Sequence, residues 1–248
     1  GTVTSSNGPE AGVWVIAETD DLETVFRKIV VTNDDGRYVL PELPEATYTV
    51  WVRGYGLVDS VPVNGRPNQE LDLKAAPART PQEAAAVYPA NYWLSIIDLP
   101  GAHEFPGTGP EGNGIDPQMR SQSEWINNLK GCQRCHQVGS LRTREVPDIE
   151  NFDSTRNAWD DRLKRGQRGP LMNSFMTRFG RDRGLDMVSD WTDRIAAGEL
   201  PPAPSRPKGI ERNVVISQWD WADPTDYLHD EVATDRRNPT VNANGPIY

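Results

Sequence analysis

Gly131-Cys132-Gln133-Arg134-Cys135-His136 contains both cysteines of the 248-residue chain. The order Cys-x-x-Cys-His is the attachment signature of a c-type haem. Two thiols at this spacing, on the first turn of a helix, can each form a thioether with a haem vinyl group. The histidine that follows then lies under the ring and offers its imidazole to the iron. The stretch predicts one covalent haem c, held by Cys132, Cys135 and His136.

Three other kinds of site use the same residue types. A thioredoxin-like redox pair normally lies near a βαβ pattern, and no Val/Ile-rich strand leads into Cys132. A zinc site needs two more ligands at short spacing, and the chain has no further cysteine. A structural disulfide is sterically poor at this spacing within one helical turn. Haem attachment therefore remains the preferred interpretation.

Composition limits the classes of function. Hydrophobic residues make up 36% of the chain and the mean hydropathy is -0.64, while 21 glycines and 21 prolines favour turns and irregular segments. No stretch approaches the roughly 18 apolar residues of a membrane-spanning helix. A formal charge of -10 argues against nucleic acid or anionic lipid as the main partner. We therefore expect no nucleic acid, no membrane span and a protein partner.

A run of arginines nonetheless follows the motif. One interpretation pairs them with aspartates on solvated helix faces. The other makes them a local basic surface beside the haem, which receives propionates or an acidic redox partner. Both interpretations stay open. The arginines are Arg142, Arg144, Arg156, Arg162, Arg165, Arg168, Arg178, Arg181 and Arg183, and the aspartates are Asp160, Asp161, Asp182 and Asp186.

Residues 1 to about 75 have the pattern of short strands. Alternating side chains over 13–18 and an apolar run over 26–31 predict two of them, with Asn33-Asp34-Asp35-Gly36 as a hairpin turn. Regular short strands separated by turns predict a β-sandwich. Further strands are expected at residues 37–40, 48–52, 58–63 and 69–73.

Three motifs of this region resemble the carboxypeptidase regulatory-like domain. They are Asn33-Asp34-Asp35-Gly36-Arg37-Tyr38-Val39-Leu40, Leu43-Pro44 and Ala46-Thr47-Tyr48-Thr49-Val50, with Ala46 where that family usually has glycine. The resemblance implies an immunoglobulin-like, transthyretin-like sandwich over residues 1–76. Such a domain makes protein–protein contacts and usually carries no catalytic residues. Asp34 and Asp35 are interpreted as turn residues rather than calcium ligands.

Residues 77–120 are expected to form a linker and an ordered loop. The composition of 75–82 is that of a linker, and Thr80 followed by Pro81 predicts the start of a short helix. Residues 88–118 are rich in glycine, proline and aromatic residues, which predicts a long loop on the haem domain. Its lone histidine, His103, is expected at the surface.

Residues 121–200 predict a mainly α-helical haem domain. Ser121 or Ser123 can cap a helix that runs into Cys132. Trp125 on this helix is expected in a core that includes the porphyrin edge. Further helices are expected over 155–166, ended by Gly166, and over about 185–197, where Met187 and Trp191 share one apolar stripe.

A helix into the motif, a methionine-bearing loop and a last helix with a central aromatic together resemble a class I cytochrome c. The resemblance implies a distal methionine before the last helix, where a Met/His pair raises the haem potential. Met172 is preferred because it follows the flexible segment 166–170, and Met176 is the alternative. His229, His103 or an open sixth position remain, and an open position would admit peroxide, oxygen or another small ligand. Met187 is expected in the core, and Met119 precedes the haem helix.

Residues 201–248 are expected to form an extended C-terminal tail. The prolines of 201–207 make a stiff connector. Residues 213–221 predict a strand with no partner in the tail, so we expect it to pair with another domain. Solvated side chains are preferred to a metal site for His229, Asp230, Glu231 and Asp235, whose spacing matches no ligand template.

The domain order resembles the N-terminal part of bacterial proteins that continue into a streptogramin-lyase-like β-propeller. The leading hypothesis is a mono-haem electron-transfer protein or module that serves a redox partner protein. The alternative is the haem module of a larger exported oxidoreductase or lyase-like enzyme, whose fused or associated catalytic domain lies elsewhere. Because bacteria attach haem c outside the cytoplasm, we expect a leader that was cleaved or left out, and a periplasmic or extracellular location.

Overall fold

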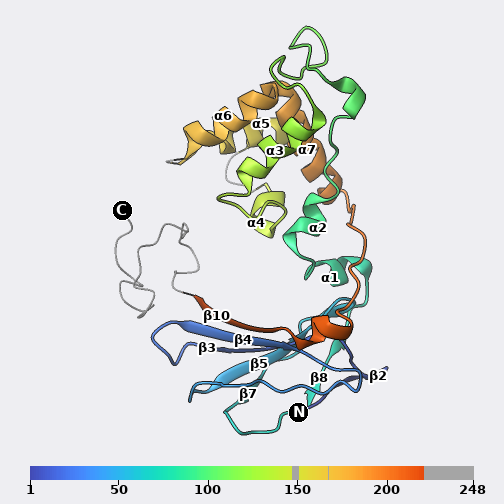
Figure 1. The fold of residues 1–248 in the computed structure, drawn as a ribbon, viewed down its shortest axis with the longest axis vertical. Helices are drawn as coiled ribbons and strands as arrows, with labels where there is room; N and C mark the ends of the chain where they lie inside the picture. Colours follow the sequence, from blue (N-terminus) through green and yellow to red (C-terminus); the bar gives the residue numbers. More distant parts are fainter. Residues whose placement is uncertain (147–150, 167, 221–248) are drawn as a thin grey trace. The chain divides into compact units, whose positions relative to one another are not determined.

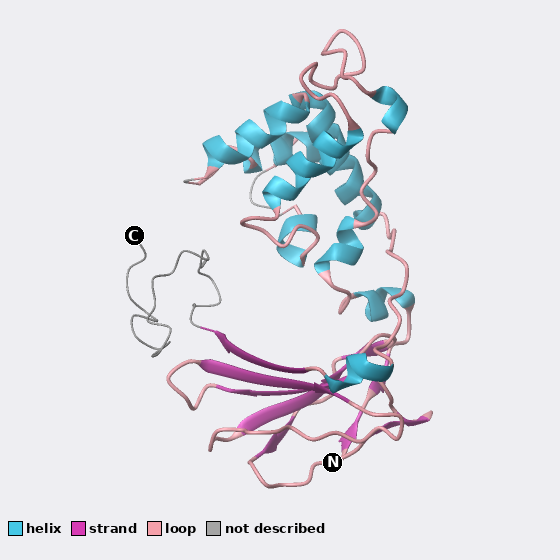
Figure 2. Ribbon diagram, in the orientation of Figure 1, coloured by secondary structure: helices cyan, strands magenta, loops and turns pink. Residues whose placement is uncertain are grey.

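The computed structural model describes residues 1–146, 151–166 and 168–220, which fall into two units. The first comprises Gly1–Val87 and the described part of Ala203–Tyr248, and the second is Tyr88–Pro202. Strands occur in the first unit, and Figure 2 distinguishes them from the helices by colour. The chain therefore combines a β-sandwich-like region with a helical region.

The main sheet of the first unit has the strand order β10-β4-β3-β5-β7 (Figure 1). Neighbouring strands are antiparallel throughout. Burial alternates along β4, which the sequence predicted as a strand from its apolar run, whereas in β3, where alternation was expected, Val15, Ile16 and Ala17 are all buried. The strands are β3 (Trp14–Thr19), β4 (Val25–Val31), β5 (Tyr48–Arg53), β7 (Val63–Gly65) and β10 (Val215–Asp220).

A smaller sheet and a two-stranded ribbon complete the β unit. Strand β1 pairs with β2 and with β8, while β6 pairs with β9. Val3 of β1 and Leu73 of β8 share one buried core with Val15, Phe26 and Val52 of the main sheet. The strands are β1 (Val3–Ser5), β2 (Gly8–Pro9), β6 (Leu57–Val58), β8 (Leu73–Lys74) and β9 (Ala76–Pro77).

The strand expected at 37–40 does not form. Asn33 Oδ1 accepts hydrogen bonds from the backbone N–H groups of Asp35 and Arg37, at 3.0 and 2.8 Å, and Gly36 takes a positive φ of 71°. The Asn33 amide thus occupies one backbone donor of this segment, that of Arg37. Among the described residues, a single bridge from Arg37 to Thr2 forms in place of a strand. The expected strands 58–63 and 69–73 are likewise reduced to short pieces at β6, β7 and β8.

The described part of the expected tail returns to the β unit. Residues 215–220 pair with β4 along the whole of β10, which confirms that this strand finds its partner outside the tail. Arg206 secures the return, because its Nη1 donates to Glu10 Oε2 at 2.5 Å and its Nε donates to the carbonyl oxygen of Tyr55 at 2.9 Å. An extended tail is therefore not the structure of 203–220. The remaining 221–248, with His229, Asp230, Glu231 and Asp235, lies outside the described residues.

Two short helices belong to the β unit. Helix α1 (Pro81–Ala85) begins as predicted, with the Thr80 side chain accepting from the Glu83 backbone N–H and proline in its first turn. The 3-10 helix η2 (Gly209–Asn213) leads into β10.

The second unit is built from helices that pack around one core. Its long helices start at serine caps where the sequence supplies them: Ser121 accepts from Glu124 N–H, and Ser154 accepts from Asn157 N–H. The elements are α2 (Ala90–Leu94), η1 (Ala102–Glu104), α3 (Gln122–Cys132), α4 (Leu141–Arg144), α5 (Thr155–Arg162), α6 (Gly169–Phe179) and α7 (Arg181–Ala196). None of the helices in the described residues is both long and apolar enough to cross a membrane.

Three features of this unit differ from the sequence prediction. The expected loop 88–118 contains α2 and η1, and Ile97 and Ile115 of this segment bury their side chains in the helical core. Helix α5 ends at Arg162, short of Gly166. Residues expected to be a flexible approach to Met172 begin α6 instead, since Pro170 suits the first turn of a helix.

Replacing Arg206 tests how much the contacts of residues 203–220 stabilise the β unit. Glu10 has a side-chain exposure of 7%, so Arg206→Gln leaves a nearly buried carboxylate without its cation. We expect the free energy of unfolding to fall by about 2 kcal/mol, discounted for the partial exposure of Arg206. Hydrogen exchange of the β3, β4 and β5 amides measures the loss within this unit. The matched control is Arg53→Gln at the exposed Arg53–Asp59 pair, where a loss as large would contradict the assignment.

Candidate functional site

The Cys-x-x-Cys-His motif lies at the C-terminal end of α3. Cys132 is the last residue of the helix, and the next turn continues with Cys135 N–H and His136 N–H donating to the Cys132 carbonyl oxygen at 3.4 and 3.2 Å. This confirms the expected helix from Ser121 into Cys132, whereas the expectation that both cysteines lie on the first turn of a helix is wrong, because Cys135 and His136 lie in the turn after α3. Both cysteines are free thiols. Burial raises the pKa of the Cys132 thiol, with a smaller contribution from Cys135.

All three side chains of the motif line one cavity of about 270 Å³. This volume is close to the roughly 300 Å³ at which small-molecule sites begin. The walls come from α3, α5, α6 and α7 and are largely apolar. They include Leu129, Trp159, Leu171, Phe175, Val188 and Trp191.

Methionines line the same cavity as the motif. Met172 and Met176 line it from α6, and Met187 lines it from α7. Met176 is 4% exposed, and a Cβ placed on Gly184 would come within 2.4 Å of its Sδ, so this thioether lies against the backbone of α7. Met172 lies about one turn earlier and is half-buried. Of the two methionines of α6, Met172 is thus the one that is less involved in packing between helices.

The other residues considered as the sixth haem ligand do not line the cavity or lie outside the described residues. His103 is exposed on η1, as expected, and Met119 is buried in the core but does not line the cavity. His229 lies outside the described residues. Within the described part of the chain, no three His, Cys, Asp or Glu side chains gather as a metal site.

Trp125 and Trp191, which the sequence predicts to lie near the haem, differ in their relation to the cavity. Trp191 lines the cavity, and its Nε1 donates to the carbonyl oxygen of Trp93 at 2.9 Å. Trp125 is fully buried but is not among the lining residues. Its ring packs at 4.4 Å between centroids against Phe179, which does line the cavity. Trp125 therefore supports the wall from behind.

The loop after His136 is held against α2 by a glycine and a buried arginine. Gly139 takes a φ of 101°, and a Cβ there would come within 1.9 Å of the Ala90 carbonyl oxygen. Arg144, 8% exposed, donates from Nη1 to the Gly139 carbonyl oxygen at 2.8 Å, and its guanidinium lies 4.0 Å from the centre of the Trp93 ring. Burial lowers the pKa of Arg144. These contacts fix the position of the turn that carries His136.

Of the arginines that follow the motif, some form ion pairs at the surface and others lie at the cavity, so each of the two interpretations applies to some of them. Arg156 pairs with Asp182 and Asp186, Arg165 with Asp161, and Arg181 with Asp160, all at the surface. Arg162 and Arg168, in contrast, line the cavity. Arg162 also donates to the backbone carbonyl of Glu145 at 3.1 Å and stacks 5.0 Å from the Trp159 ring. Positive charge is therefore present at the cavity, while other arginines of the run form ion pairs with carboxylates.

Sequence reasoning missed the cavity-lining face of α6. Leu171, Phe175 and Phe179 recur every four residues and all line the cavity. That spacing is the signal of an amphipathic helix, and it was obscured because Gly166–Pro170 suggests a loop that continues to the methionines.

No family model matches the chain, and no curated protein matches it.

Replacing Gly139 tests whether the clamped loop positions the motif. Gly139→Ala places a Cβ into the Ala90 backbone, whereas Gly198, with the same φ of 101°, has no atom within 4 Å. Backbone strain is common to both variants, so we expect Gly139→Ala to lower the free energy of unfolding by about 2 kcal/mol more than Gly198→Ala. Urea denaturation followed by helical circular dichroism measures the difference. Equal losses would show that the close contact is unimportant.

Proposed function

We propose that the chain binds one haem c through Cys132, Cys135 and His136 and transfers single electrons to or from a partner protein. The observation that carries this proposal is the shared cavity. Two free cysteines and a histidine line it from one turn, and Met172 and Met176 line it from α6. This donor set suits a covalently attached haem, whose iron supplies one-electron chemistry when bound.

Each lining group has a defined task under this proposal. Cys132 and Cys135 would hold the macrocycle through thioethers, and His136 would offer a nitrogen to the iron. Met172 would offer a sulfur, because the Met176 sulfur lies against Gly184. Arg162 and Arg168 would offer cations to the propionates. The apolar walls would exclude water from the bound haem.

The same proposal assigns a domain family to each of the two units. The helical unit is a class I-like cytochrome c domain, and the β unit is a transthyretin-like, immunoglobulin-like domain that contacts other proteins. A haem c attached by bacterial machinery places the protein in the periplasm or outside the cell. Support for these assignments is the resemblance of the motifs together with the helical and β-sandwich-like character of the two units.

Covalent attachment is tested by spectroscopy of protein exported in a host that makes haem c. We expect the α and β absorption bands of a reduced c-type haem, with the haem staying on the polypeptide after denaturation. The double variant Cys132→Ser, Cys135→Ser should release it, because no thioether can form. Full-length protein without c-type bands would end the proposal.

The distal ligand is tested by comparing Met172→Ala with Met176→Ala. We expect the first to lose the long-wavelength band of an iron–thioether bond, to lower the midpoint potential and to admit carbon monoxide. Met176→Ala should keep the band and lose stability by about 2–5 kcal/mol as a buried methionine. The opposite pattern would assign Met176, and rapid carbon monoxide binding by the unchanged protein would indicate an open iron.

A further inference from the structure

A second, polar depression lies beside the cavity of the motif. This groove of about 760 Å³ is formed by α3, α6 and the loop that leads into α3. Gly131 and Phe175 line both the groove and the cavity. A Cβ on Gly131 would come within 2.3 Å of the Phe175 ring, so the two residues are in close contact. Phe175 therefore adjoins both the groove and the cavity that the proposed haem would occupy.

The cations of this groove are not neutralised by ion pairs. Lys130, Arg134 and Arg178 line it, and all are exposed. Among the described residues none of them pairs with a carboxylate, and the Arg178 guanidinium lies over the Phe175 ring at 5.6 Å. This contrasts with Arg156, Arg165 and Arg181 of the same unit, which all form ion pairs.

Two carboxylates also line the groove, and both are engaged locally. Asp116 Oδ1 accepts from Gln118 N–H at 2.8 Å, and Glu124 Oε2 accepts from Arg120 N–H at 2.6 Å. They hold the loop before α3 and the start of α3 itself. The lining thus has more cations than anions, on a chain whose formal charge is -10.

We infer that this groove is the docking surface for an acidic redox partner, with Phe175 as the contact to the haem. The inference rests on the proposed haem and adds the place and the charge of the partner. Complementary charge steers encounter and selects orientation. Aromatic and arginine side chains, here Phe175, Arg134 and Arg178, are those that protein interfaces favour. A partner with carboxylates on its contact surface fits, and a basic partner would be repelled from this entry.

The test is the salt dependence of oxidation of the reduced, haem-loaded full chain by ferricyanide, an anionic probe. If the net charge of the protein governs the encounter, the second-order rate constant rises with salt. If the groove governs it, the rate constant falls as the Debye length shrinks from about 30 Å at 0.01 M to about 8 Å at 0.15 M salt. We expect it to fall.

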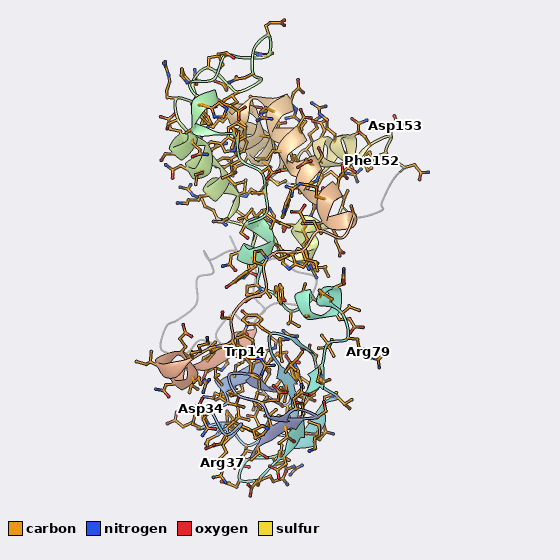
Figure 3. All side chains as sticks on the ribbon, turned by 90° about the vertical axis from the view of Figure 1, so that its right-hand side faces the viewer. Trp14, Asp34, Arg37, Arg79, Phe152 and Asp153 are labelled. Carbon is orange, nitrogen blue, oxygen red and sulfur yellow. The ribbon has the colours of Figure 1, made fainter. Side chains whose placement is uncertain are left out.

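Charge reversal identifies the residues responsible. Lys130→Glu should slow the reaction at low salt by about three- to tenfold and flatten or invert its salt dependence. Arg178→Glu is the second variant, in case the first loads haem poorly. Arg37→Glu is the matched control, because it changes the net charge equally but belongs to a turn of the β unit, labelled in Figure 3, and lines no part of the groove. An oligoglutamate peptide should slow the unchanged protein and not Lys130→Glu.

The outcomes separate the two proposals. Normal c-type bands together with a rate constant that rises with salt, or with an equal effect of Arg37→Glu, would overturn the docking surface alone. Absence of the bands would overturn the haem and the docking surface with it. A fall with salt that is confined to the unchanged protein and the Arg37→Glu control supports the groove.

Discussion

The close contact between Gly131 and the Phe175 ring sets the geometry of the helical unit. Glycine before Cys132 lets an aromatic ring lie directly on the backbone of α3, which brings α6 close to the end of that helix. Any side chain at this position would displace the ring. Because α6 carries Met172 on its cavity face, the same approach brings a thioether to the cavity entered by Cys132, Cys135 and His136.

A second constraint acts on the other side of the motif. The position of the turn that carries His136 depends on Gly139, Arg144 and Trp93. A buried guanidinium loses hydration, which the Gly139 carbonyl and the face of the Trp93 ring partly offset. Trp93 in turn accepts a hydrogen bond from Trp191 at the cavity wall. Segments far apart in sequence are thereby coupled through one group of side chains.

Local signals in the sequence were sufficient for the caps and for the alternating strands. Ser121, Ser154 and Thr80 start their helices as their side-chain chemistry predicts. The helical state of Met172 was not predicted, since Gly166–Pro170 has the composition of a loop, and Pro170 serves equally well in a first helical turn. The strand at 37–40 failed because Asn33 competes for its backbone donors. Both errors come from residues that are compatible with two local structures.

Contacts between distant parts of the chain were the hardest to predict from the sequence. The pairing of β10 with β4 joins Val215 to Val30, and no local pattern specifies a partner so remote. The same limit applies to the cavity. The spacing of Cys132, Cys135 and His136 is enough to predict that these three residues share a site. Arg162, Arg168 and Phe175 line the same cavity only because of how α5 and α6 pack, which the sequence does not show.

The return of β10 makes the helical unit an insertion within the β unit. During synthesis, β4 is complete long before its outer neighbour exists, so the nascent sandwich has an open edge while Tyr88–Pro202 is being made. Open edges invite pairing with other chains. Folding that begins only after the whole chain has been made would let β10 cover this edge before the edge can pair with another chain. The order of strands in this sheet thus favours folding of the completed chain over folding during synthesis.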